Sequence, residues 1–300
     1  MAFFLALDIG GTKTDYLLAD DTRELARVRT GTIKRMRTDA QTAATNLDQA
    51  LAELTSIANV AMSAITRTCV GTAGETVSLV TDWLRESVTA RVSGDLILVG
   101  DVEIALDAAF HGGIGVLAMA GTGSNVAGRK PDGTLVTAGG WGPALADQGS
   151  GHRIGLEALR AAFLAKDEGS PTRLLDAILK FWNLDSLDDL VAFANSHPAP
   201  DFSRLTELIL HHANTGDPIA ASVLHREGAD LGWLVRLVLR QLPQDPPPRI
   251  AFTGSILEKV QPVRDALIAS VQSEFPTITA IEGVVDPIAG ALWRARSTWP

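Results

Sequence analysis

Short apolar runs separated by glycine-containing or acidic turns open the chain. Residues 3–8 are apolar enough for a buried strand, Gly10–Thr12 predicts a tight turn, and residues 14–19 form a second apolar run. Asp20–Asp21 predicts another turn, after which residues 24–28 can return as a third strand. The chain is therefore expected to begin as a three-stranded meander whose first turn is rich in glycine.

The same design returns in the middle of the sequence. Residues 115–120 are apolar, 121–123 turn, 124–128 run back, 131–133 turn again, and 134–138 follow. Two meanders with equivalent glycine turns indicate an internal duplication.

After each meander the pattern changes to helical segments that alternate with short apolar strands. In the first half we expect helices near 38–58 and 75–90 and strands at 66–70 and 96–99. In the second half we expect a strand at 250–253 after helices near 152–165, 172–181, 202–213 and 218–241. The pattern predicts an α/β protein of two mixed domains, 1–112 and 113–300, with a cleft between them.

The composition is that of an ordinary soluble enzyme. Apolar residues make up 46% of the 300 residues and charged residues 20%, far from the composition of a disordered chain. The 26 Lys and Arg against 35 Asp and Glu give a net charge of −9, which repels nucleic acids and anionic membranes. We therefore expect no nucleic-acid partner and no membrane partner.

The cysteine content and the length of the apolar runs indicate the cellular compartment of the protein. The single Cys69 excludes a disulfide within the chain and any site built from several thiolates of one chain. No run reaches the ~18 uninterrupted apolar residues of a membrane span, and residues 1–7 lack the basic flank of a signal peptide. These features predict a soluble, cytoplasmic protein.

The first glycine turn has the residue types of a phosphate-binding loop. In Asp8–Thr14 a carboxylate ends a strand and small residues follow, so backbone N–H groups could approach phosphate while the carboxylate holds a hydrated Mg²⁺. The alternative is a simple hairpin. The segment is neither a Walker loop nor a dinucleotide fingerprint, because it lacks GxxxxGK[ST] and is followed by a strand.

Two further turns favour the phosphate interpretation. Gly121–Asn125 is a glycine turn at the equivalent place in the repeat, and two such turns facing one cleft could grip one triphosphate. Phe252–Ser255 is a strand that ends in Gly-Ser before a helix, which suits a backbone surface beside a nucleoside. By itself that last segment is an ordinary strand-to-helix turn.

Asp101 lies where a reacting carboxylate is expected. Residues 96–100 form an apolar strand, and the carboxyl end of such a strand is the usual ligand edge of an α/β sheet. A carboxylate there can accept the proton of an alcohol during phosphoryl transfer. The alternative is that Asp101 only caps a helix that begins at Val102.

Together these segments resemble the sugar kinase, Hsp70 and actin superfamily, and within it the N-acetylglucosamine kinases related to the BadF/BadG/BcrA/BcrD ATPases. The resemblance spans nearly the whole chain and is most specific between residues 101 and 151. The matching segments are Gly100–Asp101, Asp107–Ala109, Gly121–Asn125, Gly139–Gly142, Asp147–Gly151 and, as the family's last helix, Asp286–Ala291.

The resemblance implies two ribonuclease H-like (actin-like ATPase) domains, with a last helix at about 286–298 that packs back on the N-terminal domain. It also implies ATP and Mg²⁺ as cofactors, Asp101 as the catalytic base, and Asp8 near the metal through water. The residues that it places at ATP are Gly10, Gly11, Thr12, Lys13, Thr122, Gly123, Gly216, Gly254 and Ser255. Those that it places at the sugar are Thr32, Asp101, Ser124, Asn125, Gly140, Trp141, Gly142 and Asp147.

Two of the sugar residues have structural alternatives. Asp147 could instead cap a helix near Ser150, and Trp141 could instead plug a glycine turn. The loop 31–37 also departs from the family pattern, because Thr32 and Lys34 stand where the family places an asparagine and often an aromatic residue against the sugar. The cations of this region, here called the basic cluster, meet an anionic sugar or form a solvated loop; they are Arg27, Arg29, Lys34, Arg35 and Arg37.

The predicted function is transfer of the ATP γ-phosphoryl group to a hydroxyl, by our interpretation the 6-hydroxyl, of N-acetylglucosamine or glucosamine. The alternatives are a kinase for a muramic-type or other anionic sugar or for glucose, and a regulatory BadF-type ATPase without sugar transfer. BadF-like activators need two cysteines per subunit for a bridging iron–sulfur cluster, which Cys69 alone does not supply.

The sequence also contains information on metal binding and on contacts between subunits. The cysteine-rich zinc motif of ROK glucokinases is absent and the six histidines have no compact ligand spacing, so Mg²⁺ is the one metal expected. A homodimer stays open, because the helix with Leu231, Trp233 and Leu234 could pack within the chain or on a partner.

Overall fold

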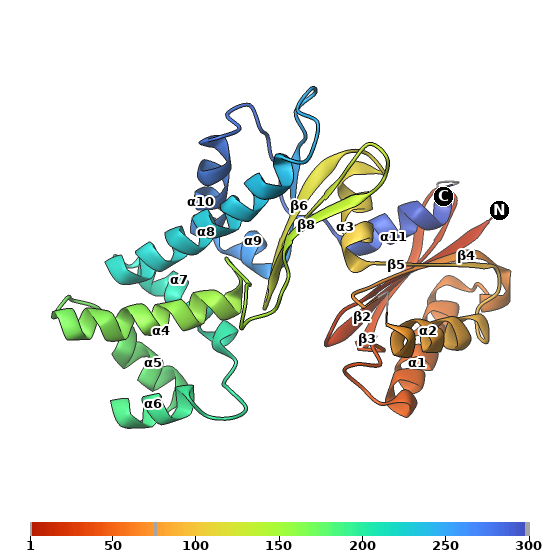
Figure 1. The fold of residues 1–300 in the computed structure, drawn as a ribbon. Helices are drawn as coiled ribbons and strands as arrows, with labels where there is room; N and C mark the ends of the chain where they lie inside the picture. The colour runs from red at the N-terminus through yellow and green to blue at the C-terminus, as the bar shows by residue number, and fades with distance from the viewer. Residues whose placement is uncertain (1, 75–76, 298–300) are drawn as a thin grey trace. The chain divides into compact units, whose positions relative to one another are not determined.

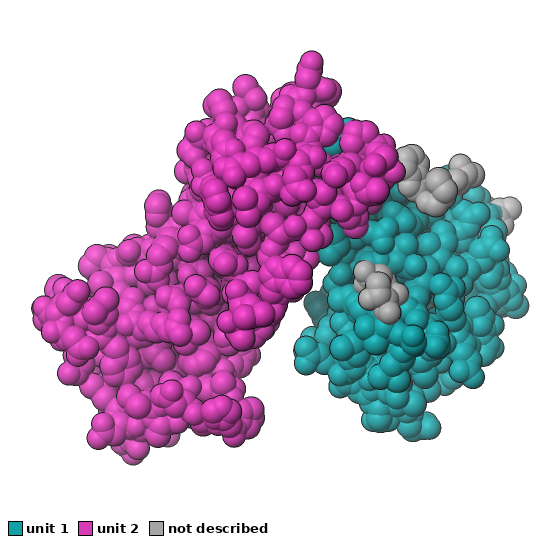
Figure 2. Space-filling view, viewed as in Figure 1, with its two compact units in different colours: residues 1–115, 285–300 teal, residues 116–284 magenta. Residues whose placement is uncertain are grey.

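The computed structural model describes residues 2–74 and 77–297, which form two compact units (Figure 2). Unit 1 takes its residues from 1–115 and 285–300, and unit 2 comprises residues 116–284. In the part of the chain that the structure describes, none of the helices combines the length and the apolar character needed to cross a membrane.

Unit 1 is built on a mixed sheet of five strands: β1 (Phe3–Ile9), β2 (Lys13–Asp20), β3 (Glu24–Gly31), β4 (Ile65–Thr72) and β5 (Asp95–Val99). Their order is β3-β2-β1-β4-β5 (Figure 1). β1 pairs antiparallel with β2 and parallel with β4, which in turn pairs parallel with β5. β1 is the central strand and is apolar except for Asp8, whereas β3 alternates buried and exposed residues at the sheet edge. The prediction of all five strands is confirmed.

The helices of unit 1 cover both faces of this sheet, and they are α1 (Ala40–Ala58), the short 3₁₀ helix η1 (Met62–Ala64), α2 (Ser78–Thr89), α3 (Asp101–Phe110) and α11 (Pro287–Arg296). Successive β1 side chains point to opposite faces. Leu5 and Leu7 pack in the core with α1 and α2, and Phe4 and Ala6 pack in the core with α3 and α11. The first two residues of the predicted helix 75–90, and residue 298 of the predicted last helix, lie outside the described residues.

Unit 2 repeats the sheet design with the strands β6 (Gly115–Ala120), β7 (Ser124–Arg129), β8 (Leu135–Gly139) and β9 (Ile250–Thr253). The order is β8-β7-β6-β9, with β9 parallel to β6 and β8 antiparallel to β7. This is the order β3-β2-β1-β4 of unit 1 over again. The strand order therefore confirms the predicted duplication of a mixed α/β unit.

Helices make up most of the rest of unit 2, and they are α4 (Gly151–Glu168), α5 (Leu174–Trp182), α6 (Leu187–Ala194), the 3₁₀ helix η2 (Phe202–Leu205), α7 (Thr206–Asn214), α8 (Pro218–Leu239), α9 (Ser255–Lys259) and α10 (Gln261–Gln272). The core lies between these helices and the sheet. α8 and α10 run side by side (Figure 1). They approach closely at Gly232, where a Cβ would lie 2.8 Å from the Leu267 carbonyl oxygen. The sequence prediction missed α6 and α10.

Candidate active site

The first glycine turn is held in place by its own hairpin and by Thr32, which lies directly after β3. The Gly10 N–H donates to the Lys13 carbonyl oxygen at 3.0 Å, and the Thr32 N–H donates to the Thr12 carbonyl oxygen at 3.2 Å. The Thr32 hydroxyl donates to the Gly10 carbonyl oxygen at 2.7 Å and accepts from the Lys34 N–H at 3.0 Å. Thr32 is a predicted sugar ligand, but in this structure its hydroxyl donates its proton to the glycine turn and stabilises it.

The second glycine turn is held in a different way, from the start of α4. The Gly151 N–H donates to the Gly121 carbonyl oxygen at 2.8 Å, and the His152 N–H donates to the Thr122 carbonyl oxygen at 3.2 Å. Two of the otherwise unpaired N–H groups of a helix N-terminus are thereby used to fix the loop. Thr122 and Gly123 remain exposed at its tip.

Glycine in both turns leaves room that the protein itself does not use. Neither Gly11 nor Gly121 adopts the left-handed region, so an L side chain would be allowed by the backbone. A Cβ on Gly11 would lie 3.9 Å from Arg37 Nε, and one on Gly121 would lie 4.0 Å from Ser255 Oγ, which are ordinary contacts. The space in front of each turn suits an external group such as a phosphate.

A pocket of about 440 Å³ adjoins the second glycine turn, within unit 2. This volume is in the range of small-molecule sites. The pocket brings together β6–β7, α4, η2, α7 and α9, and its lining residues are Gly121, Thr122, Gly151, Ser203, Thr206, Glu207, Leu210, Ser255, Ile256, Lys259 and Val260. Of the predicted ATP residues, Thr122 and Ser255 therefore lie at one site.

Two other predicted ATP residues of unit 2 lie beside this pocket or away from it. Gly254 has φ +95° and supports the pocket wall, because a Cβ there would overlap the Ala120 carbonyl oxygen at the end of β6. Gly216 instead lines a separate depression with Thr172, Arg173 and Asp217. Sequence reasoning missed Lys259, an exposed cation that lines the main pocket and could have been noticed one turn after Ser255.

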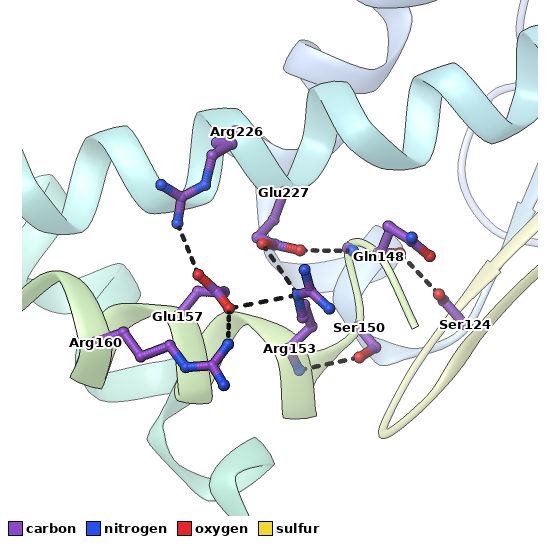
Figure 3. Close-up of polar contacts among 9 residues, drawn as sticks. Ser124, Gln148, Ser150, Arg153, Glu157, Arg160, Arg226 and Glu227 are labelled. Atoms are coloured by element: carbon purple, nitrogen blue, oxygen red, sulfur yellow. Dashed lines mark hydrogen bonds and ion pairs between the residues drawn. The ribbon is translucent and has the colours of Figure 1, made fainter. Parts of the chain in front are cut away.

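A buried carboxylate on α8 supports the loop before α4. Figure 3 shows Glu227 directed at this loop, where its Oε2 accepts from the Gly149 N–H at 3.0 Å. Arg153 Nε lies 3.8 Å from Glu227 Oε1, and the Ser124 hydroxyl donates to the Gln148 carbonyl oxygen at 2.7 Å. Burial raises the pKa of Glu227, while the Gly149 N–H and Arg153 oppose that shift. The loop that joins the predicted sugar residues to α4 is thus held from both sides.

The predicted sugar residues of unit 2 gather around this loop. The buried Asp147 accepts from the Ser124 N–H at 3.3 Å through Oδ1. Asn125 Oδ1 is buried and has no hydrogen-bond partner in the described residues. A buried acceptor without a donor costs about 1–3 kcal/mol, so a ligand hydroxyl would satisfy it. Gly140 lies against the same amide, since a Cβ there would be 3.0 Å from Asn125 Cγ.

The structure decides against both alternatives for Asp147 and Trp141. Ser150 is the N-cap of α4 and accepts from the Arg153 N–H at 3.1 Å, so Asp147 does not cap this helix. The Trp141 side chain is 75% exposed and does not plug the turn between Gly140 and Gly142. Binding sugar by these side chains stays a prediction.

In unit 1, Asp8 and Asp101 lie at the carboxyl ends of β1 and β5. Burial and then the neighbouring Asp101 raise the pKa of Asp8 from 3.8 to about 7, with Asp15 and Asp286 adding to the shift and Lys13 opposing it. Two carboxylates that disfavour each other's charge are a suitable donor set for a hydrated Mg²⁺, since the cation removes that conflict. In the residues that the structure describes, no three or more His, Cys, Asp or Glu side chains are grouped so that they could hold a metal ion by themselves.

The capping alternative for Asp101 is wrong in its details. The N-cap of α3 is Gly100, and Asp101 is the first helical residue. Asp101 Oδ1 accepts from the Val102 N–H at 2.9 Å, while the capping interaction is made by Glu103, whose Oε2 accepts from the Gly100 N–H at 3.1 Å. The Asp101 carboxylate thus accepts from an amide of the first turn, but Asp101 is not the N-cap of α3.

Most of the basic cluster is engaged within unit 1. Arg27 pairs with Asp286 at 2.7 Å, and Arg29 pairs with Asp15 through two hydrogen bonds of 2.7 and 3.1 Å. Arg35 donates to the Thr38 carbonyl oxygen at 2.5 Å. These contacts favour a structural role, in which Arg27 and Arg29 compensate acidic residues near Asp8.

Comparison with known proteins gives a family match over nearly the whole chain. A model of the BadF/BadG/BcrA/BcrD ATPase family matches residues 5–295. The chain belongs to this family. Family membership confirms the resemblance and implies the use of ATP.

Relatives of this family member carry the names of amino-sugar kinases. The N-acetylmuramic acid/N-acetylglucosamine kinase of Clostridium acetobutylicum is 26% identical over 306 residues, 99% of each chain. The glucosamine kinase GspK of Vibrio cholerae is 33% identical over 174 residues, 57% of this chain and 56% of its own. A crystal structure from Chromobacterium violaceum, described as an N-acetylglucosamine kinase, is 26% identical with a TM-score of 0.74, covering 97% of this chain and 98% of that chain. This likeness confirms the predicted two-domain fold.

The raised pKa of Asp8 predicts how the stability of this family member depends on pH without metal. A carboxyl that titrates near 7 when folded and near 3.8 when unfolded holds its proton more tightly in the folded state. Its contribution to stability is therefore present below pH 4 and lost as the pH rises through 7. We expect the melting temperature to fall more between pH 5 and pH 8 in the wild type than in Asp8→Asn, measured by differential scanning fluorimetry with EDTA. Parallel curves for the two proteins would contradict this.

Proposed function

We propose that the protein is an ATP-dependent phosphotransferase that transfers the γ-phosphoryl group to an amino sugar, at the 6-hydroxyl of N-acetylglucosamine or glucosamine. The observation that carries the proposal is the placement of Asp101 beside Asp8 at the carboxyl edge of the unit 1 sheet, in a chain whose relative over 99% of its length is a sugar kinase. The glucosamine and N-acetylglucosamine kinases among its relatives support the acceptor class.

Phosphoryl transfer needs an aligned acceptor, charge neutralisation and a group that takes the acceptor's proton. Asp101 takes the proton of the sugar hydroxyl as the oxygen attacks phosphorus, and its position at the first residue of α3 leaves the capping task to Glu103. Asp8 would hold a hydrated Mg²⁺, and Asp101 is close enough to add its negative charge to the site. The metal, when bound, neutralises charge on the phosphate oxygens.

We assign the remaining predicted residues either to the nucleotide or to the sugar. The glycine turns at Gly10–Lys13 and Gly121–Gly123 bind the phosphates through backbone N–H groups, and the unit 2 pocket with Ser255 and Lys259 takes the nucleoside end. Asn125 Oδ1 and the Asp147 carboxylate accept hydrogen bonds from sugar hydroxyls. Trp141 offers an exposed aromatic face to the sugar ring.

The test is ADP release with and without candidate acceptors. We expect release to depend on N-acetylglucosamine or glucosamine, and ³¹P NMR of the product to show a phosphate ester on oxygen 6. Glucose, N-acetylmuramic acid and 6-deoxy-N-acetylglucosamine are the comparison acceptors, the last because it lacks the attacking hydroxyl. ATP hydrolysis at the same rate with and without every sugar would instead indicate a regulatory ATPase and overturn the proposal.

A further inference from the structure

A buried ion pair joins the last helix of unit 1 to the helix that begins with Asp101. Arg294 on α11 donates from Nε to Asp107 Oδ2 on α3 at 2.6 Å. Asp107 is fully buried and Arg294 is 7% exposed. The two residues are far apart in sequence, so only the packing of α11 against α3 brings them together.

The same guanidinium reaches one turn toward the start of α3. Arg294 Nη1 lies 3.5 Å from Glu103 Oε1, and the other oxygen of that carboxylate, Oε2, accepts from the Gly100 N–H at 3.1 Å. One carboxylate therefore faces the arginine with one oxygen and the N-cap amide with the other. Contacts from Arg294 to Glu103 and from Glu103 to Gly100 therefore connect α11 to the residue directly before Asp101.

Stability alone does not account for this charged arrangement. α11 already packs on the same core through Ile288, Ala291 and Leu292, which lie with Ile104 of α3. A buried ion pair is weak evidence for stability, because the cost of removing both charges from water offsets most of their attraction. An arginine that meets two carboxylates of one helix restrains the rotation and the first turn of that helix, which apolar contacts do less well.

We propose that Arg294 and Glu103 are positioning residues for Asp101: the guanidinium fixes the Glu103 carboxylate, and Glu103 fixes the Gly100 N–H that sets the first turn of α3. The inference rests on the proposed function, in which Asp101 accepts the acceptor's proton. Neither residue touches substrate in this scheme. Both act by keeping Asp101 in the geometry that proton transfer needs, where a misplacement of about 1 Å can cost about 10²-fold in rate.

The deciding experiment is a double-mutant cycle between Glu103 and Asp101. Glu103→Ala is expected to lower kcat about 10- to 100-fold, with the KM for ATP within about twofold of wild type. Glu103→Gln keeps an acceptor for the Gly100 N–H and is expected to recover most of that loss. In an Asp101→Asn background Glu103→Ala should lower kcat no further, because the residue acts through Asp101. Amide hydrogen exchange of residues 101–104 should be faster in Glu103→Ala than in Glu103→Gln.

Arg294 and Arg296 provide a matched pair on one helix. Both are arginines of α11 with tertiary hydrogen bonds, but Arg296 donates to the carbonyl oxygens of Asp20 and Arg23 and not to α3. Arg294→Met is expected to lower kcat at least tenfold at a temperature where it is folded, and Arg296→Met to keep kcat within about twofold. Should Arg294→Met not fold, the Glu103 cycle decides alone.

The inference fails if Glu103→Ala lowers kcat by the same factor with and without Asp101, or if Glu103→Ala leaves kcat unchanged. Equal losses of kcat in Arg294→Met and Arg296→Met would also overturn it. Failure of the proposed function has a different signature, because ADP release by the wild-type protein would then be the same with and without every sugar.

Discussion

Replacing Asp101 with asparagine is expected to lower kcat for sugar phosphorylation by about 10² to 10⁴, the usual contribution of a positioned general base. The amide has nearly the shape of the carboxylate but cannot take the proton of the attacking hydroxyl. Because Asp101 is the first residue of α3 and Gly100 and Glu103 make the cap, the helix should begin at the same place. Nucleotide affinity, measured by calorimetry with an unreactive ATP analogue, should stay close to that of wild type.

Asp95 provides the control for this substitution. It lies at the opposite end of β5, is exposed, and pairs with Arg67 at 3.8 Å. Asp95→Asn should therefore change neither kcat nor nucleotide affinity, because exposed ion pairs contribute little. Normal turnover in Asp101→Asn, or an equal loss in Asp95→Asn, would remove Asp101 from the mechanism.

Gly290→Ala is expected to destabilise unit 1 by about 3 kcal/mol or more, although the change adds a single methyl group. In an unconstrained helix the same substitution would stabilise by about 1 kcal/mol, because alanine has the higher helix propensity. Here a Cβ would overlap the Ile104 carbonyl oxygen and lie 2.5 Å from the Ala108 nitrogen. These are backbone atoms of α3, which cannot move aside by changing a rotamer. α11 and α3 must separate, and the Arg294–Asp107 pair between them should weaken.

Thermal unfolding and limited proteolysis would check this expectation. Ala289→Ser is the matched control, because Ala289 is the preceding residue of α11 and its side chain is exposed. The control should melt within about 1–2 °C of wild type, since exposed substitutions change stability by about 0.5 kcal/mol or less. A melting temperature for Gly290→Ala at or above that of wild type would show that the two helices are not packed as described.

Several candidate site residues could be predicted from the sequence because their proposed role depends on their position along the chain. A strand followed by a turn places Asp8 and Asp101 at a sheet edge whatever the rest of the protein does, and the carboxyl edge is where ligands bind. The repeat of a glycine turn at Gly121–Asn125 was likewise visible as a pattern. Lys259 was missed, because its place in the pocket depends on how α9 packs against α7 and the β6–β7 turn.

Two structural alternatives that the sequence left open were wrong for the same physical reason. Asp101 was a plausible helix cap from its place before Val102, yet the carboxylate of Glu103 reaches back to the Gly100 N–H. Trp141 was a plausible plug, yet it is 75% exposed. Both outcomes depend on how side chains are placed in three dimensions, and the spacing of residues along the sequence does not determine that placement.

Strand period, glycine turns and chain direction are local properties, so the sequence alone was enough to predict the duplicated meander, most of the elements that follow each copy, and the acidic residues at strand ends. The contacts of Arg294 with Asp107 and Glu103, of Glu227 with the Gly149 N–H, and of the Thr32 hydroxyl with the Gly10 carbonyl oxygen could be found only in the folded protein. Each of these contacts joins residues from different elements. Their geometry depends on how helices and sheets pack, and that packing is the sum of many weak contacts spread along the chain.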